Sequence, residues 1–99
     1  MKGYTYILKC ADDSFYTGST KDIARRLEQH NAGEGANHTK KNLPVELVYL
    51  KIFDRIDAAF NREKQIQGWS RKKKIALIEN NRENLVEFSK AYRDIIKTH

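Results

Sequence analysis

The amino-acid sequence predicts a small mixed α/β (α+β) domain with a three-stranded sheet, in the order β-β-α-β-α-α-α. Residues 2–9 and 45–53 alternate their side chains with a period of two, as strands do. Later segments space their apolar residues three and four apart, as amphipathic helices do. A chain of 99 residues typically forms one hydrophobic core, so we expect a single domain.

The N-terminal segment predicts a β-hairpin. Residues 2–9 place Tyr4, Tyr6 and Leu8 on one face of a first strand. Residues 11–14 supply Asp and Ser side chains, which satisfy backbone donors in turns. A second apolar and aromatic stretch, residues 15–19, follows at once, and two such runs joined by a short turn indicate a hairpin.

A helix and a third strand follow the hairpin. Asp22 or Thr20 can cap the helix, which carries Ile23 on its apolar face and ends near Ala32, where glycines begin. Residues 33–44 form a polar loop closed by a proline. The third strand, residues 45–53, is apolar enough to be the central strand of a sheet.

Three further helices are predicted in the second half of the chain. Asp57 opens the first of them, and Gly68 ends it. Ser70 can cap the next, and a terminal amphipathic helix is expected over about residues 83–97. The residues expected on the packed sides of these helices are Ala59, Phe60, Glu63 and Ile66, then Ile75, Leu77 and Ile78, then Leu85, Phe88, Tyr92, Ile95 and Ile96.

Composition and charge exclude several classes of protein. No apolar run approaches the ~20 residues of a membrane-spanning helix, and no targeting segment is evident, so we expect a cytoplasmic protein without a membrane partner. The lone Cys10 excludes an intrachain disulfide and a cysteine-rich zinc site, and is expected to be a small buried hydrophobe. Nineteen basic against 13 acidic residues give a net charge of +6, which favours an anionic partner such as nucleic acid.

Five residues could carry chemistry. Tyr6 and Tyr16 lie on adjacent strands of the hairpin, while Arg26 and His30 are four apart and share one helix face. Glu63 stands among apolar neighbours, where an ionised carboxylate is costly unless it is paired or metal-bound. Purely structural alternatives are cross-strand packing for the tyrosines, a solvated helix face for Arg26 and His30, and a surface carboxylate for Glu63.

This ordered set resembles the GIY-YIG nuclease superfamily, in particular its small stand-alone bacterial members, over about residues 2–80. Tyr4-Thr5-Tyr6 occupies the first signature tripeptide and Tyr16-Thr17-Gly18 the second. Arg26 lies ten residues after Tyr16, His30 follows one helical turn later, and Glu63 lies in the helix after the third strand. The resemblance implies a three-stranded antiparallel sheet flanked by helices, with an extra C-terminal helix.

The resemblance also implies a reaction, the metal-dependent hydrolysis of phosphodiester bonds, with DNA favoured over RNA as the substrate. Glu63 would bind one Mg²⁺ or Mn²⁺ ion, held weakly without substrate. Tyr16 would be the general base, Tyr6 would position it, Arg26 would clamp a phosphate oxygen, and His30 would bind phosphate or relay a proton near neutral pH. The small size leaves little room for sequence readout, so cleavage should be relaxed or directed by substrate structure. The rival interpretation is a catalytically weak nucleic-acid-binding module. No protein partner is indicated.

Less specific signals concern nucleic-acid contact. Basic runs at residues 38–41 and 71–74 could grip phosphates, or simply form a solvated loop tip and helix face. Trp69 is expected to pack over a helix turn rather than stack on a base, and no metal site beyond Glu63 is expected. The candidate contact residues are Ser19, Lys40, Lys41, Arg71, Lys72, Lys73 and Asn81, with Asn80 as an alternative to Asn81.

Overall fold

A three-stranded antiparallel sheet forms the centre of the protein in the computed structural model, which describes residues 1–83 and 85–86. The strands are β1 (Gly3–Lys9), β2 (Phe15–Thr20) and β3 (Glu46–Phe53), in the spatial order β2-β1-β3. The helices are α1 (Ile23–Asn31), α2 (Asn37–Lys41), α3 (Ile56–Gln67) and α4 (Arg71–Glu79). The predicted fold class and antiparallel sheet are therefore confirmed.

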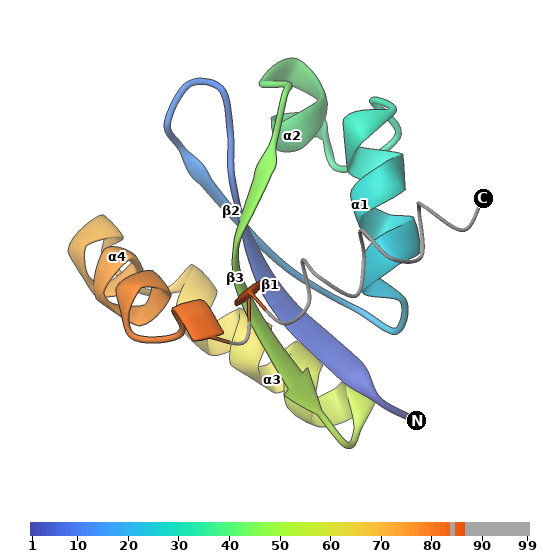
Figure 1. Ribbon diagram of the computed structural model, residues 1–99, viewed down its shortest axis with the longest axis vertical. Coiled ribbons are helices and arrows are strands. Elements are labelled where there is room, and N and C mark those ends of the chain that lie inside the picture. Colours follow the sequence, from blue (N-terminus) through green and yellow to red (C-terminus); the bar gives the residue numbers. More distant parts are fainter. Residues whose placement is uncertain (84, 87–99) are drawn as a thin grey trace.

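The sheet is the middle of three layers. Helices α1 and α2 lie together on one side, and α3 and α4 lie on the other (Figure 1). Two hydrophobic clusters lie on opposite faces of the sheet, and alternate side chains of β1 belong to each. Tyr6 and Leu8 pack under α1, whereas Ile7 packs with Tyr49 and Ile66 under α3. Among the described residues, no helix has the length and apolar character needed to cross a membrane.

The strand order corrects one prediction. The apolar β3 was expected to be central, but β1 is central and pairs with both β2 and β3. The register of β1 and β3 shifts between Ile7 and Leu8, which are paired with Tyr49 and Leu47. Because of this irregularity, Leu47 and Leu50 pack against the same core although they are three residues apart. The strong apolar character of β3 therefore reflects packing on both faces, which sequence alone cannot distinguish from a central position.

Local capping signals predicted the helix ends well. The Asp22 side chain accepts a hydrogen bond from the Arg25 N–H and caps α1, and Ser70 caps α4 in the same way. Gly68 ends α3, although the helix begins at Ile56, one residue before Asp57. These bonds join residues close in sequence, which is why they could be predicted.

Three predictions from the sequence differ from the structure, and a fourth concerns residues that the structure mostly does not describe. The segment 33–44 is not only a loop, because it contains α2. Phe60 and Ile75 were expected to pack inward, but their side chains are 49% and 37% exposed. Most of the predicted terminal helix, about residues 83–97, lies outside the described residues.

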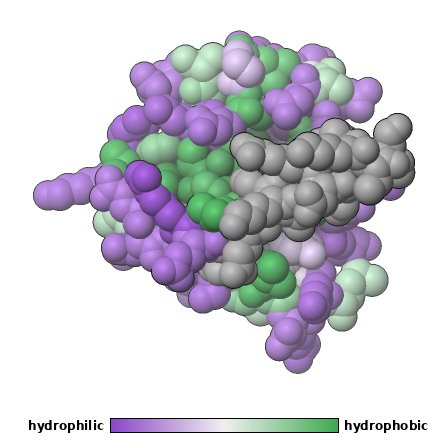
Figure 2. Space-filling view, viewed as in Figure 1, coloured by the Kyte–Doolittle hydropathy of each residue, from purple (hydrophilic) through white to green (hydrophobic). Residues whose placement is uncertain are grey.

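Hydrophilic side chains cover most of the periphery of the face in Figure 2, and hydrophobic residues gather nearer the centre of that face.

Helix α3 is fixed on the sheet by a polar contact as well as by apolar packing. The buried Thr5 hydroxyl donates a hydrogen bond of 2.7 Å to the carbonyl of Ala59. Ala59 and Ile66 are fully buried and face the sheet from the same helix. Glu63 lies one turn after Ala59, so these contacts also determine where its carboxylate stands.

Candidate active site

Gly18 allows Tyr6 to reach the edge of the sheet. The two residues are directly paired across β1 and β2. A Cβ atom at position 18 would lie only 2.5 Å from the Tyr6 hydroxyl oxygen and 2.6 Å from its Cζ. The hydroxyl end of the Tyr6 ring therefore lies against the glycine and reaches the outer strand β2.

A chain of hydrogen bonds runs inward from the Tyr6 hydroxyl. The Tyr6 oxygen lies 3.0 Å from His30 Nε2, and His30 Nδ1 lies 2.9 Å from the Thr39 hydroxyl. Thr39 donates its one proton to the carbonyl of Ala36, so it must accept a proton from His30 Nδ1. His30 Nε2 is then an acceptor, and the Tyr6 hydroxyl donates to it. The direction of every hydrogen bond in the chain is thus determined by the Ala36 carbonyl, which can only accept.

His30 is buried, and its ring is hydrogen-bonded at both of its nitrogens. Its side chain is 0% exposed, and burial, followed by the charge of Arg26, lowers its pKa from 6.5 to about 4. The expectation that His30 titrates near neutrality is therefore wrong, and a fully buried ring cannot contact phosphate. Gly35 closes the pocket, because a Cβ there would lie 2.2 Å from His30 Nδ1.

The two tyrosines differ in accessibility. Tyr6 is 1% exposed, and burial raises its pKa to about 12 despite an opposing hydrogen bond from Arg26. Tyr16 is only half-buried. Its ring centroid lies 6.4 Å from that of Tyr6 and 5.4 Å from that of His30, in edge-on geometry with the histidine. Of the pair, Tyr16 is the tyrosine that a bound molecule can reach.

Arg26 brings a positive charge to both tyrosines. Burial lowers its pKa, but the hydroxyls of Tyr6 and Tyr16 outweigh this effect and leave the pKa raised. One guanidinium nitrogen also donates to Gln29 Oε1 at 3.1 Å, which holds the side chain on the surface of α1. A half-buried guanidinium with donors to spare is well suited to an anionic oxygen.

Glu63 approaches the same edge of the sheet from the opposite layer. Its Oε1 accepts a hydrogen bond of 2.6 Å from Ser19, and its Oε2 accepts one of 2.8 Å from Gln67. The carboxylate is near enough to Tyr6 that its charge adds to the effect of burial, which is the main cause of the raised pKa of Tyr6. Helix α3 thus places Glu63 next to β2, where the Tyr6 hydroxyl lies against Gly18.

The donor set at Glu63 fits a hard divalent cation. Each carboxylate oxygen accepts one hydrogen bond from the part of the chain that the structure describes, so lone pairs remain on both oxygens. Mg²⁺ commonly uses one or two carboxylates and completes its shell with water and substrate phosphate. Ser19 and Gln67 would orient the ligand, as outer-shell groups do at metal sites.

Sequence reasoning missed three contributors to this arrangement. Thr39 and Gly35 belong to the segment predicted as a polar loop, and their contacts with His30 depend on the fold of that segment. Gln67 lies four residues after Glu63 on α3, and this spacing was a usable signal because such pairs meet on one helix face. The other two had no local signal.

The candidate nucleic-acid contacts do not form one group. Ser19 is bonded to Glu63, and the Asn81 amide donates to the Leu77 carbonyl of the preceding helix. Arg71 donates to the Asp13 carbonyl at 2.7 Å and covers the ring of Phe15. The remaining members are exposed: Lys40 and Lys41 on α2, and Lys72 and Lys73 on α4.

Trp69 packs as expected. It is half-buried against the core that contains Ile66. Two cations lie over its ring, Arg62 at 4.8 Å and Lys73 at 4.2 Å from the centroid. These contacts occupy the ring within its own domain.

Comparison with known proteins decides the family. The description "GIY-YIG catalytic domain" belongs to a family model that matches residues 2–76. The chain belongs to the GIY-YIG family. All five candidate residues lie inside the matched segment, in the order and on the elements described above.

Relatives of this GIY-YIG chain carry names that state no activity. A "UPF0213 protein" of Haloquadratum walsbyi is 49% identical over 76 residues, covering 77% of this chain and 85% of that protein. Another, from Staphylococcus saprophyticus, is 51% identical over 77 residues, covering 78% and 94%. The family is one of nucleases that act on nucleic acid, and this chain is a small member of it.

Two solved structures share the GIY-YIG fold. The solution structure of a UPF0213 protein from Bacillus halodurans is 39% identical with a TM-score of 0.53, covering 80% of this chain and 84% of that one. The solution structure of a protein from E. faecalis is 33% identical with a TM-score of 0.56, covering 81% and 85%. The fold of the sheet and its helices is thus shared with solved relatives.

Proposed function

We propose that this chain is a metal-dependent endonuclease that hydrolyses phosphodiester bonds in DNA. One observation carries the proposal: Tyr6, Tyr16, Arg26, His30 and Glu63, from both helical layers and the hairpin, converge at the edge strand β2. A structural role for each residue alone would not require a common meeting point. The net charge of +6 supports an anionic substrate.

The difference in accessibility supports different roles for the two tyrosines. The Tyr6 hydroxyl donates its proton to His30, so its lone pairs face outward towards Arg26. A pKa of about 12 makes Tyr6 a positioning group rather than the base. Tyr16 is accessible and lies beside the same guanidinium, so it accepts the proton of the attacking water.

Charge at the phosphate is divided between the two layers. Arg26 binds a non-bridging phosphate oxygen with its planar fork. Glu63, oriented by Ser19 and Gln67, holds a divalent ion, Mg²⁺ or Mn²⁺. Such an ion supplies Lewis-acid stabilisation of the charge that develops on the phosphoryl group.

Little sequence selectivity is expected of this enzyme. The matched domain occupies residues 2–76, which leaves few described residues for base readout. The exposed lysines of α2 and α4 would add affinity for the backbone that falls with salt. Cleavage therefore depends on strand structure, such as a junction or a single-stranded segment, more than on sequence.

The test is cleavage of supercoiled plasmid, branched DNA and single-stranded DNA with Mg²⁺ or Mn²⁺. Tyr16→Phe, Arg26→Ala and Glu63→Gln should each lower the cleavage rate by roughly 10²-fold or more, the size expected when one group acting in the transition state is lost. Binding should weaken most for Arg26→Ala. Matched controls are Tyr4→Phe, Arg25→Ala and Glu79→Gln, which change the same residue types outside the site.

Two outcomes would contradict parts of the proposal. Full cleavage by Glu63→Gln would rule out the metal-binding role of that carboxylate. Salt-sensitive binding to DNA without cleavage by the wild type, under any of these conditions, would favour the rival nucleic-acid-binding module.

A further inference from the structure

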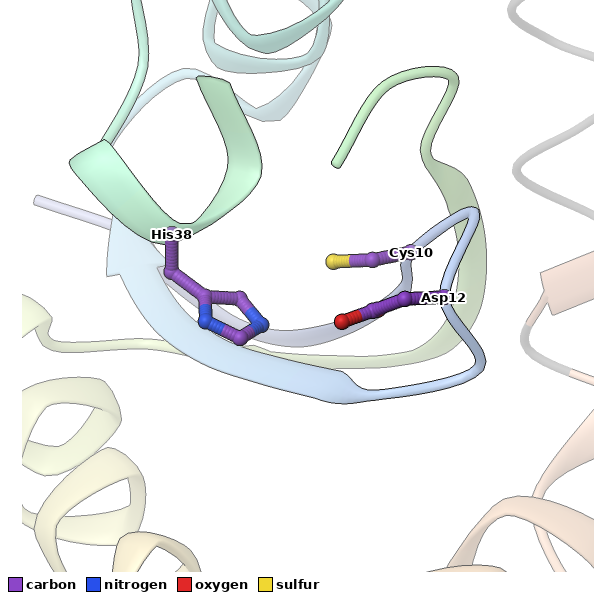
Figure 3. A group of neighbouring side chains, drawn as sticks. All are labelled: Cys10, Asp12 and His38. Carbon is purple, nitrogen blue, oxygen red and sulfur yellow. The ribbon is translucent and has the colours of Figure 1, made fainter. Parts of the chain in front are cut away.

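Three metal-binding residue types meet at the end of the hairpin away from Glu63. Cys10 follows β1, Asp12 lies in the turn to β2, and His38 belongs to α2 (Figure 3). One potential ligand atom from each residue lies within 4.8 Å of the other two. Figure 3 shows the imidazole and the carboxylate directed towards each other, with the sulfur atom beside them.

The local backbone holds these residues in place. The Ala11 N–H donates to the Asn42 carbonyl at 2.9 Å, which ties the hairpin turn to the end of α2. The Asn42 amide in turn donates to the His38 carbonyl at 2.8 Å. The turn itself is closed by the Cys10 N–H, which donates to the Ser14 carbonyl at 2.8 Å. Ligands from two separate segments are therefore preorganised by bonds that do not use their side chains.

The ligand chemistry distinguishes between metals. A thiolate and an imidazole are poor ligands for Mg²⁺ but good ones for Zn²⁺, which also accepts a carboxylate. Zinc bonds of about 2.0–2.3 Å in tetrahedral geometry separate the ligand atoms by about 3.6 Å. The largest separation between the ligand atoms must therefore shorten by only about 1 Å to reach that geometry.

A hydrolytic triad is the alternative use of such residues, and the geometry opposes it. Ser14 lies between the other groups, donating to Asp12 and lying 2.6 Å from His38 Nε2. In a triad the carboxylate would hold the other ring nitrogen of the histidine. Here the carboxylate contacts the serine instead, so the hydroxyl proton is directed to Asp12 and not to the histidine.

We propose that Cys10, Asp12 and His38 form a Zn²⁺ site with three protein ligands and a solvent molecule in the fourth position. Zinc–sulfur bond formation releases the thiol proton to solvent, with no change of oxidation state. The ion would clamp the hairpin turn to α2. Because Thr39 follows His38 and accepts the proton of His30, this clamp also stabilises the inner end of the hydrogen-bond chain to Tyr6.

Metal binding to the full chain tests the proposal directly. Equilibrium dialysis against Zn²⁺ should give one ion per chain, and Co²⁺ should give the thiolate charge-transfer absorption and the intense visible bands of a tetrahedral site. Cys10→Ala, Asp12→Asn and His38→Gln should each weaken binding at least about tenfold. Asp12 and His38 are exposed, so their variants should fold, which circular dichroism checks.

The controls separate this site from the proposed active site. Asp13→Asn changes the neighbouring carboxylate at a positive φ of 68° that asparagine tolerates, and should keep full Zn²⁺ binding. Glu63→Gln should also keep it, whether or not the chain cleaves DNA. Free Zn²⁺ about 100-fold above its Kd should raise the Tm of the wild type by roughly 10 °C or more. Unchanged binding in His38→Gln and Cys10→Ala, or loss of binding in Glu63→Gln, would overturn the assignment.

Discussion

The hydroxyl of Tyr6 lies over the backbone of Gly18, its direct partner across β1 and β2. The smallest side chain is thus required at the point where a buried tyrosine reaches the edge of the sheet. Alanine there would place its Cβ 2.6 Å from the Tyr6 Cζ, a separation that real structures do not show.

Gly18→Ala should therefore displace Tyr6 and destabilise the fold by about 1–3 kcal/mol, as overpacking does, although alanine is intrinsically the better strand residue. Urea denaturation measures the change. Gly68→Ala is the control, because its Cβ would make an ordinary 3.6 Å contact with the Gln65 carbonyl. Equal stability of the two variants would contradict the close approach.

Thr39 and Thr17 should respond oppositely to valine. Thr39→Val leaves the buried His30 Nδ1–H without its acceptor, while the Ala36 carbonyl keeps the Lys40 N–H, so the substitution should cost about 1–3 kcal/mol. Thr17 Oγ1 is buried and has no hydrogen-bond partner in the part of the chain that the structure describes. Thr17→Val should therefore be neutral or stabilising by about 1 kcal/mol. Thermal and denaturant unfolding of the two variants checks this difference in sign.

Stability should fall as pH falls from about 6.5 towards 4. The pKa of His30 is about 4 in the folded protein because of burial and Arg26, against 6.5 for the free side chain. Between these values the unfolded chain binds a proton that the folded chain does not, so the free energy of unfolding decreases by about 1.4 kcal/mol per pH unit. Above this window His30 is neutral in both states and contributes no pH dependence.

Two histidine variants isolate this effect. With a chelator present, His30→Gln should lose the decrease in unfolding free energy between pH 6.5 and 4, whereas His38→Gln should retain it because it leaves the buried His30 in place. An unchanged pH profile in His30→Gln would assign the effect to other groups.

Ser19→Ala should weaken the proposed cation site without removing it. The Ser19 hydroxyl donates to Oε1 of Glu63 and fixes the direction of the carboxylate. Loss of such an outer partner typically costs about 10–100-fold in metal affinity. The Mg²⁺ concentration for half-maximal DNA cleavage should rise accordingly, with the rate at saturating Mg²⁺ largely retained. An unchanged Mg²⁺ requirement would show that Glu63 does not depend on Ser19 for its orientation.

What the sequence could predict was mostly local. The Asp22 and Ser70 side chains cap the starts of their helices by accepting a backbone N–H three residues later, and Gly68 ends α3 through its own N–H; these boundaries were predicted. Alternation indicated β3, but its place at the edge depends on long-range pairing with β1, which no local pattern encodes. Phe60 has the helical spacing of a core residue, yet α3 turns it outward.

The candidate site shows the same division. Its five residues could be named from their order along the chain, through the family resemblance. The buried, neutral state of His30 could not, because it results from α2 and Gly35 closing over the ring. The Cys10 cluster was also unpredicted, since its histidine comes from a helix that the sequence did not reveal.

The hydrogen bond from Thr5 to the Ala59 carbonyl has a consequence for variation in this protein. This hydrogen bond lies one helical turn from Glu63. The distance between the Glu63 carboxylate and the hairpin is therefore determined by how closely α3 packs on the sheet. A larger side chain at Ala59 would remove no polar group, yet it would lift α3 and shift Glu63 away from Tyr16. Core residues such as Ala59 therefore determine the geometry of the candidate site, and a substitution in the core would alter that site without changing any of its five residues.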